Sequence, residues 1–227
     1  MQSYQSKLLN QYSGKNVDNY EGVRNSSQRW ASEIACFDSV LESVNPKFVI
    51  DCPIGTCRWA DAYVNHGIIK LIGLDASLDM LEKSRNTIID KGIKEYSLEK
   101  VDLISGEGFK SFGNPDLVVC IRFLNWLCLS KVKSTILNIS NLQSQHMLIG
   151  VSVFDRNRGP FSNFISFIKL KTNNIKRYFS GLAPIYVHNK KLIEKEICES
   201  GWKIISINPI FEDEIRLNLF FLLQRKN

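Results

Sequence analysis

Short apolar runs alternate with helix-like segments between residues 29 and 154, and this alternation limits the fold more than any other feature of the chain. The runs are continuously apolar, which is typical of parallel strands that are buried on both faces. Helices packed on both sides of a sheet provide that burial. We therefore expect strands at 48–51, 68–75, 97–104, 115–124 and 146–154, with helices that include 29–44, 77–92 and 129–142.

The C-terminal part adds a further helix, which Gly201 ends, and two apolar runs at 203–210 and 217–226. We expect these runs to pair antiparallel at the edge of the sheet. The predicted fold class is α/β: a three-layer sandwich with a mostly parallel seven-stranded sheet, helices on both faces and an antiparallel C-terminal edge hairpin. One domain would span 29–227, after a polar lead-in or lid at 1–28.

The composition is that of a globular protein. The chain has 227 residues, enough for one domain with a complete core. Its apolar runs are shorter than the roughly 20 residues needed to span a bilayer, and the first residues lack the apolar stretch of a secretory signal. The six cysteines have spacings that suit neither a disulfide framework nor a metal site. We expect free thiols, no metal and a cytoplasmic location.

The net charge of +6 leaves the class of partner open. A basic surface can attract nucleic acid, a membrane surface or an anionic substrate. It can also be the average surface of a basic protein, and the absence of a run of five or more like charges favours that interpretation.

Charged residues follow the predicted strands at the edge where ligands bind in parallel sheets. Asp51, Asp75, Asp102 and Arg122 stand at or near the carboxyl ends of four strands. Gly55 would let a ligand approach the backbone closely. Asp75 lies 24 residues after Asp51, a distance at which an acid is placed to accept hydrogen bonds from ribose hydroxyls. These features predict an adenosine-containing ligand.

Four segments carry a resemblance to a known family. The stretch "VIDCPIGTCRW" (49–59) resembles motif I of the class I S-adenosylmethionine (SAM)-dependent methyltransferases, D-x-G-x-G-x-G, in its D-x-P-x-G-T-G-R variant. "GLDASLDML" (73–81) resembles the second motif, D-x-S-x-x-M-L. "PDLVVCIRFLNWL" (115–127) and "GWKIISI" (201–207) look like the fourth and sixth strands of that family. The four segments occur in the family's order.

The resemblance implies a set of SAM-binding residues. Four would face the methionine part: Asp51, Pro53, Gly55 and Thr56. Asp75 would bind the ribose, and the adenine would contact Ala76, Met80, Asp102 and Leu103. Cys120 and Arg122 would lie near the reactive methyl, and Tyr20 and Arg29 would close over the cofactor from the N-terminus. Alternatives remain: Met80 as a core residue, Asp102 as a turn cap, and a solvated helix entry at the N-terminus.

One residue of the first motif departs from the family. Cys57 stands where the pattern has glycine, and we expect its side chain to narrow the space beneath the methionine part. Pro53 is a recognised variant in that family, and it suits a backbone that keeps φ near −65°.

A hydroxyl acceptor would benefit from a general base. His188 and Asp155 are the candidates, because they stand near the fifth strand's carboxyl end and the following insert. His66 and His146 are expected to be structural.

The insert at 155–187 combines phenylalanines with basic residues. Phe161, Phe164, Phe167 and Ile168 have the spacing of an apolar helix stripe, with four basic residues nearby: Lys169, Lys171, Lys176 and Arg177. The insert could be a substrate lid for an anionic acceptor, a membrane-surface segment, a helix packed on the domain or a dimer contact, and the lid and the dimer contact are favoured.

The expected function is transfer of a methyl group from SAM to a small-molecule or saccharide- or lipid-linked acceptor, with oxygen as the favoured atom. DNA is disfavoured because "CIRF" (120–123) replaces the N/D-P-P-Y/F motif of base amino-group methylation, while RNA and a homodimer stay open. Two alternatives remain: a SAM-using enzyme that transfers no methyl, such as a lyase or aminopropyl-type transferase, and a degenerate relative that binds a partner protein.

Overall fold

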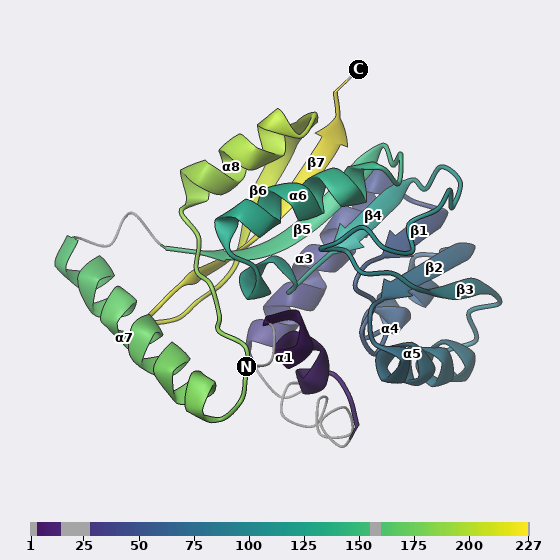
Figure 1. Ribbon diagram of the computed structural model, residues 1–227. Coiled ribbons are helices and arrows are strands. Elements are labelled where there is room, and N and C mark those ends of the chain that lie inside the picture. Colours follow the sequence, from purple (N-terminus) through teal and green to yellow (C-terminus); the bar gives the residue numbers. More distant parts are fainter. Residues whose placement is uncertain (1–3, 15–27, 155–159, 227) are drawn as a thin grey trace.

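A seven-stranded sheet with helices on both faces forms the body of the protein, whose structure here is a computed structural model (Figure 1). The structure describes residues 4–14, 28–154 and 160–226. The strands are β1 (Phe48–Asp51), β2 (Lys70–Asp75), β3 (Glu95–Lys100), β4 (Leu117–Cys120), β5 (His146–Val153), β6 (Trp202–Glu212) and β7 (Leu217–Arg225). The helices are α1 (Tyr4–Gln11), α3 (Gln28–Val44), α4 (Ala60–Asn65), α5 (Leu78–Asp90), η1 (Leu124–Trp126), α6 (Leu129–Ser140), α7 (Pro160–Phe179) and α8 (Lys190–Glu199). The predicted fold class is confirmed.

The strand order β3-β2-β1-β4-β5-β7-β6 creates the site. Strands β1 to β5 run parallel, while β7 pairs antiparallel with both β5 and β6. After β1 the chain continues to β2 on one side of β1, and it later returns to β4 on the other side. The connections that follow β1 and β4 therefore diverge at the carboxyl ends of these two strands. Such a switch point leaves a crevice in open parallel sheets.

Two hydrophobic clusters, one on each face, hold the layers together. Alternate residues of one strand enter opposite clusters: Val49 packs with α3, α4 and α5, while Ile50 packs with α6 and α8. The same alternation along β4 explains why its four residues are all buried. Burial on both sides accounts for the continuous apolar character of the central strands.

Two predicted boundaries are corrected. We placed the third strand at 97–104, but β3 spans Glu95–Lys100, is polar and forms the sheet's edge. After it, the amide of Val101 donates to the carbonyl of Asp75, and the chain turns over the end of β2. The fourth strand is shorter than the predicted 115–124, because the backbone leaves the sheet at the positive-φ residue Arg122.

The α5 helix begins as the sequence indicates. Ser77 is its N-cap, with its hydroxyl accepting a hydrogen bond from the Met80 amide, and Gly92 follows its end with φ of 74°. This places a helix N-terminus directly beyond the end of β2. Within residues 4–14, 28–154 and 160–226, none of the helices has both the length and the apolar character that crossing a membrane requires.

Candidate functional site

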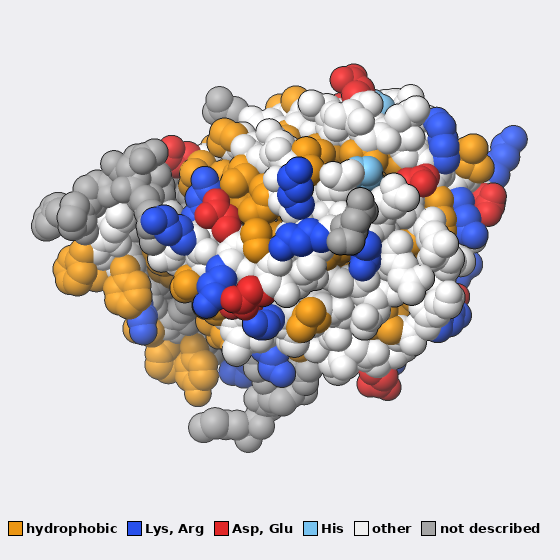
Figure 2. Space-filling view, turned by 90° about the horizontal axis from the view of Figure 1, so that it is seen from above, with side chains coloured by type: hydrophobic (Ala, Val, Ile, Leu, Met, Phe, Trp, Pro, Cys, Tyr) orange, Lys and Arg blue, Asp and Glu red, His pale blue; other side chains and the backbone are white. Residues whose placement is uncertain are grey.

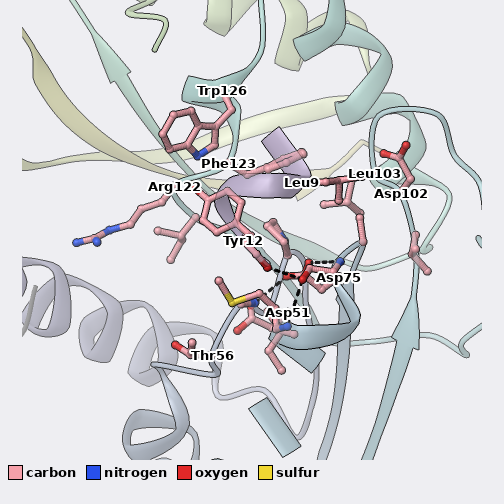
Figure 3. A pocket seen from close by; sticks show the side chains of 18 of the residues that line it. Leu9, Tyr12, Asp51, Thr56, Asp75, Asp102, Leu103, Arg122, Phe123 and Trp126 are labelled. Atoms are coloured by element: carbon pink, nitrogen blue, oxygen red, sulfur yellow. Dashed lines mark hydrogen bonds between the residues drawn. The ribbon is translucent and has the colours of Figure 1, made fainter. Parts of the chain in front are cut away.

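A pocket opens at the carboxyl ends of β1, β2 and β4 (Figure 3). It brings together ten residues that the sequence singled out: Asp51, Pro53, Gly55, Thr56, Asp75, Ala76, Met80, Asp102, Leu103 and Arg122. They come from the turn after β1, the start of α5, the turn after β3 and the loop after β4. Residues distant in sequence therefore share one cavity at the switch point of the sheet.

Asp75 joins the two turns that form the base of the pocket. Its Oδ2 atom accepts a hydrogen bond from the Gly55 amide at 3.0 Å, and its Oδ1 atom accepts one from the Ser77 amide at 2.9 Å. Burial raises the pKa of this carboxyl to about 6, against the opposing effect of the backbone hydrogen bonds. Each carboxylate oxygen can accept a second hydrogen bond, so Asp75 can still bind hydroxyl groups of a ligand.

Asp51 is the second buried acid of the pocket. The Tyr63 hydroxyl donates to its Oδ2 atom at 2.9 Å. Burial raises the pKa of Asp51 to about 8, and the nearby charge of Asp75 adds to the rise, while the Tyr63 hydrogen bond lowers it. A cationic ligand group beside Asp51 would favour its ionised form.

The turn between the two acids is open toward the pocket at Gly55. Gly55 has φ of 56°, a backbone conformation that residues with a side chain rarely adopt. A Cβ atom built on Gly55 would meet no atom of the described residues within 4 Å. A side chain here would extend into open space where the pocket lies. The peptide bond before Pro53 is cis.

Cys57 contradicts our expectation that its side chain narrows the ligand space. It is fully buried in the cluster that contains Phe37 of α3 and Trp59, and its side chain is not part of the pocket lining. Its φ of 56° explains the family's glycine at this position. The departure therefore affects the backbone conformation and the core rather than the cavity.

A short N-terminal helix lies over the pocket, within the segment that the sequence predicts as a lead-in or lid; the helix and its contact residues were not predicted. Leu9 of α1 and Tyr12 line the cavity, and the Tyr12 ring meets Trp126 edge-on at 6.1 Å between centroids. The carbonyl of Tyr12 accepts a hydrogen bond from the Ser77 hydroxyl at 2.6 Å, and the Gly14 amide donates to Asp79 at 2.8 Å. These two hydrogen bonds hold the residues after α1 against the start of α5, over the pocket.

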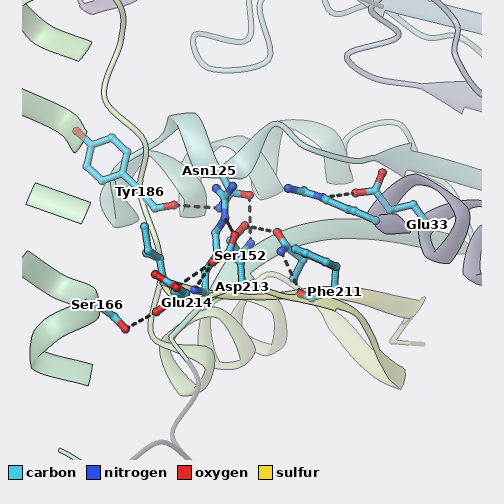
Figure 4. A network of polar contacts seen from close by, with 12 residues as sticks. Glu33, Asn125, Ser152, Ser166, Tyr186, Phe211, Asp213 and Glu214 are labelled. Carbon is cyan, nitrogen blue, oxygen red and sulfur yellow. Dashed lines mark hydrogen bonds and ion pairs between the residues drawn. The ribbon is translucent and has the colours of Figure 1, made fainter. Parts of the chain in front are cut away.

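Arg29, one of the two predicted N-terminal contacts, lies elsewhere. Arg29 is not part of the pocket lining; its Nε atom pairs with buried Glu33 at 2.9 Å. Glu33, which Figure 4 labels, also pairs with Arg122, so two guanidinium groups share one buried carboxylate. Tyr20 lies outside the described residues.

Two further candidates, Cys120 and His188, do not line the cavity. Cys120 is fully buried in the sheet, and burial raises the pKa of its thiol above the usual range. Asp155 lies outside the described residues. His188 is buried behind the loop after β4, with its Nε2 atom 3.1 Å from the carbonyl of Leu124. Burial lowers the pKa of His188, against the opposing effect of the Leu124 carbonyl, and its catalytic role stays a prediction.

A polar network positions the loop that follows β4 (Figure 4). The Asn125 side chain accepts from the Ser152 amide at 3.1 Å and donates to the carbonyl of Tyr186 at 2.9 Å. The Ser152 hydroxyl in turn donates to Asn218 of β7. Because Phe123 and Trp126 flank this anchored segment, the network fixes two aromatic side chains of the pocket wall.

Solved structures match this architecture along nearly the whole chain. Magnesium protoporphyrin IX methyltransferase of Synechocystis PCC 6803, with bound SAH (S-adenosylhomocysteine), superposes with a TM-score of 0.75 and 13% identity, over 98% of this chain and 100% of that one. The N-methyltransferase NodS of Bradyrhizobium japonicum WM9, also with bound SAH, gives 0.67 and 12% identity, over 99% and 98%. An O-methyltransferase family protein from Burkholderia thailandensis gives 0.61 and 14% identity, over 90% and 61%.

The chain has the Rossmann-like methyltransferase fold. No family model matches the sequence. No curated protein matches it either. The likeness therefore lies in the three-dimensional arrangement. At sequence identities of 12–14%, this likeness establishes the fold.

Several residues of this methyltransferase-fold pocket were missed at the level of sequence. They include Leu9, Tyr12, Arg58, Trp59, Phe123 and Trp126. Arg58 and Trp59 end the motif I stretch at 49–59, but the resemblance assigned them no role. The others depend on how α1 and the loop after β4 fold over the sheet, which local patterns do not indicate.

The left-handed backbone at Cys57 predicts an unequal response to two substitutions. Cys57→Gly relieves a conformational cost of roughly 1 kcal/mol while losing a small buried side chain, so its net change should stay within about 1 kcal/mol. Cys57→Val adds a β-branched side chain at positive φ in a filled cluster and should destabilise by about 2–3 kcal/mol. Urea unfolding measures both.

The matched control for Cys57→Val is Cys120→Val. Cys120 is equally buried but lies in strand β4, where a β-branched residue suits the backbone. Equal costs at the two positions would contradict the conformational explanation.

The raised pKa of Asp51 predicts that stability falls with rising pH. Its pKa is about 8 in the folded protein and near 4 when unfolded, so the folded state holds the proton more tightly. The resulting stabilisation is complete below pH 4 and is lost as pH rises from 4 to 8, at up to about 1.4 kcal/mol per pH unit. Asp51→Asn should remove this part of the slope in urea unfolding measured across that range.

The control is Asp90→Asn, at an exposed aspartate at the end of α5. This variant should follow the wild-type slope. Parallel curves for Asp51→Asn and the wild type would show that Asp51 does not titrate in this window.

Proposed function

We propose that the protein is a SAM-dependent methyltransferase that acts on a small-molecule or saccharide- or lipid-linked acceptor, with oxygen as the favoured acceptor atom. The observation that carries the proposal is the pair of buried carboxylates, Asp51 and Asp75, on either side of the open Gly55 turn. A ligand with a ribose and a cationic group at opposite ends of one molecule suits this arrangement.

The residues present fit SAM. Asp75, already oriented by two backbone amides, would accept hydrogen bonds from the ribose hydroxyls. Ionised Asp51 would face the positively charged methionine end, whose charge offsets the unfavourable burial of the carboxylate. Met80, Leu103 and the end of the β3 turn at Asp102 would enclose the adenine.

The Asp102 carboxylate also caps its own turn. Its Oδ1 atom accepts from the Ile104 amide at 2.8 Å. The turn-cap role and a contact with adenine are compatible, because the second carboxylate oxygen can accept from an exocyclic amine.

The acceptor side of the pocket is apolar and aromatic with basic groups near it. Tyr12, Phe123 and Trp126 form one wall, while Arg58 and Arg122 also line the cavity. A cavity roofed by α1 suits a small acceptor or the end of a larger one better than a nucleic-acid duplex. The arginines favour an acceptor that carries a negative charge.

Bound SAM would supply an activated methyl group, which leaves the protein with the tasks of orientation and water exclusion. The aromatic wall and the α1 roof exclude water, and a fixed acceptor geometry can supply most of the acceleration. We propose His188 as the proton acceptor for a hydroxyl group; because it does not line the cavity, the loop after β4 would have to move for the acceptor to reach it. Because its Nε2 atom lies against a carbonyl, that nitrogen carries the proton and Nδ1 is the basic atom.

Calorimetric titration tests cofactor binding. The wild type should bind SAM and S-adenosylhomocysteine, and Asp75→Asn should weaken SAM binding about 10- to 100-fold, the loss of charge-assisted hydrogen bonds to the ribose. Asp90→Asn removes the same charge at an exposed position and should bind like the wild type. Failure of the wild type to bind either compound would favour the degenerate, partner-binding alternative.

Incubation of cell extract with the protein and methyl-labelled SAM tests the reaction, with mass spectrometry as the readout. We expect a labelled, methylated small molecule and S-adenosylhomocysteine. Consumption of SAM without a methylated product would instead support a lyase or an aminopropyl-type transferase. His188→Gln, which retains a side-chain amide near the Leu124 carbonyl, should lower turnover at least about tenfold without changing SAM affinity.

A further inference from the structure

Helix α7 is attached to the domain in the reverse of the usual manner for a surface helix. Its inward contacts are polar: the hydroxyl of buried Ser166 donates to the Glu214 carbonyl at 2.8 Å, and the Asn174 side chain bonds both the carbonyl and the amide of Ile185. The Arg177 guanidinium donates to the carbonyl of Ala183 at 2.7 Å. Amphipathic surface helices normally bury their apolar side instead.

The apolar side chains of α7 are exposed, and four of them line an open groove beside residues 184–187 rather than packing into the core. Phe164, Ile168, Ile175 and Phe179 recur at intervals of four and seven, and Phe167 and Tyr178 adjoin them on the same face. Their exposures range from 46% for Phe167 to 83% for Phe179. We call these six residues the α7 stripe. Figure 2 shows hydrophobic side chains gathered at the end of the molecule where α7 lies in Figure 1, with basic side chains among them.

The charge of α7 limits what can cover the stripe. The helix has four basic residues and no acidic one among its 20 residues. Lys171 lies within the stripe, 5.4 Å from the Phe167 ring centroid, and Lys176 borders it as an exposed residue. Lys7 of α1 lies over the Tyr178 ring and adds a third positive charge.

The acidic residues nearby are on the loop between β6 and β7 and already have basic partners. Glu214 pairs with Lys169, and Asp213 pairs with Arg216 at 3.1 Å. The exposed apolar face therefore has a positive surround. A second copy placed symmetrically on the stripe would bring the same positive charges together.

We infer that α7 docks the protein on the surface of an anionic phospholipid bilayer. A helix with aromatic and aliphatic residues on one face and lysines beside them lies in the bilayer interface, where its apolar side enters the acyl boundary and its lysines meet anionic headgroups. The stripe runs along a helix about 30 Å long, and that length suits an extended surface better than a small ligand. Helix α7 also contacts the surroundings of the pocket. The Arg177 guanidinium donates to Gln11 of α1 at 2.7 Å and lies 5.1 Å from the Trp126 ring centroid.

Flotation of the full chain with vesicles tests the inference, which does not depend on SAM binding. The protein should bind vesicles of phosphatidylcholine with phosphatidylglycerol, should bind pure phosphatidylcholine vesicles more weakly, and should be released from the anionic vesicles by salt. Phe164→Ser with Ile175→Ser should lower vesicle partitioning at least about tenfold. The matched control, Ile89→Ser with Leu137→Ser, removes exposed apolar side chains from α5 and α6 and should leave partitioning unchanged.

A second pair of variants tests the charge. Lys171→Gln with Lys176→Gln should weaken binding to anionic vesicles, whereas Lys94→Gln with Lys203→Gln, at exposed positions elsewhere, should not. Circular dichroism and urea unfolding confirm that each variant is folded. The inference is overturned if anionic vesicles do not bind the wild type or if the α7 variants bind as the wild type does. Self-association in analytical ultracentrifugation that the α7 apolar variant abolishes, without vesicle binding, would assign the stripe to a second copy.

Discussion

The carboxylate of Asp75 is the contact on which the site depends. It ends β2, yet it accepts the amide of Gly55 from the turn after β1 and the amide of Ser77 from the start of α5. Three segments therefore take their relative positions from one buried side chain. Because its two oxygens are oriented by backbone donors, the carboxylate is held ready for a ligand without reorganisation, which lowers the cost of binding.

Holding two acids in this crevice has an energetic cost. Burial raises the pKa of both Asp51 and Asp75, so the unliganded protein favours protonation or loses stability at neutral pH. A cationic ligand removes that penalty at Asp51. Stability and ligand affinity are thus linked through the same carboxyl groups, as is expected where a protein maintains an unfavourable electrostatic arrangement for function.

Helices α1 and α7 extend this arrangement beyond the sheet. Tyr12, at the end of α1, contacts Trp126 of the pocket wall and the Ser77 hydroxyl at the start of α5. Arg177 joins α1 to α7 through Gln11. These contacts connect the roof of the pocket to α7. Binding at the α7 stripe is therefore linked by a short series of contacts to residues that line the cavity.

The sequence by itself determined the sheet, because burial on both faces leaves a continuous apolar signal. It also determined about half of the residues that line the pocket, because Asp51, Gly55 and Asp75 lie within or beside short local motifs. It did not locate Tyr12 or Trp126 in the cavity, since their positions depend on contacts between segments far apart in the chain. The φ of 56° at Cys57, which turns its side chain into the core, and the burial of His188 behind the Leu124 carbonyl were also decided by tertiary packing. Local sequence patterns indicate which face of a strand or helix is buried. Only the packing of the layers decides which side chains that face contacts.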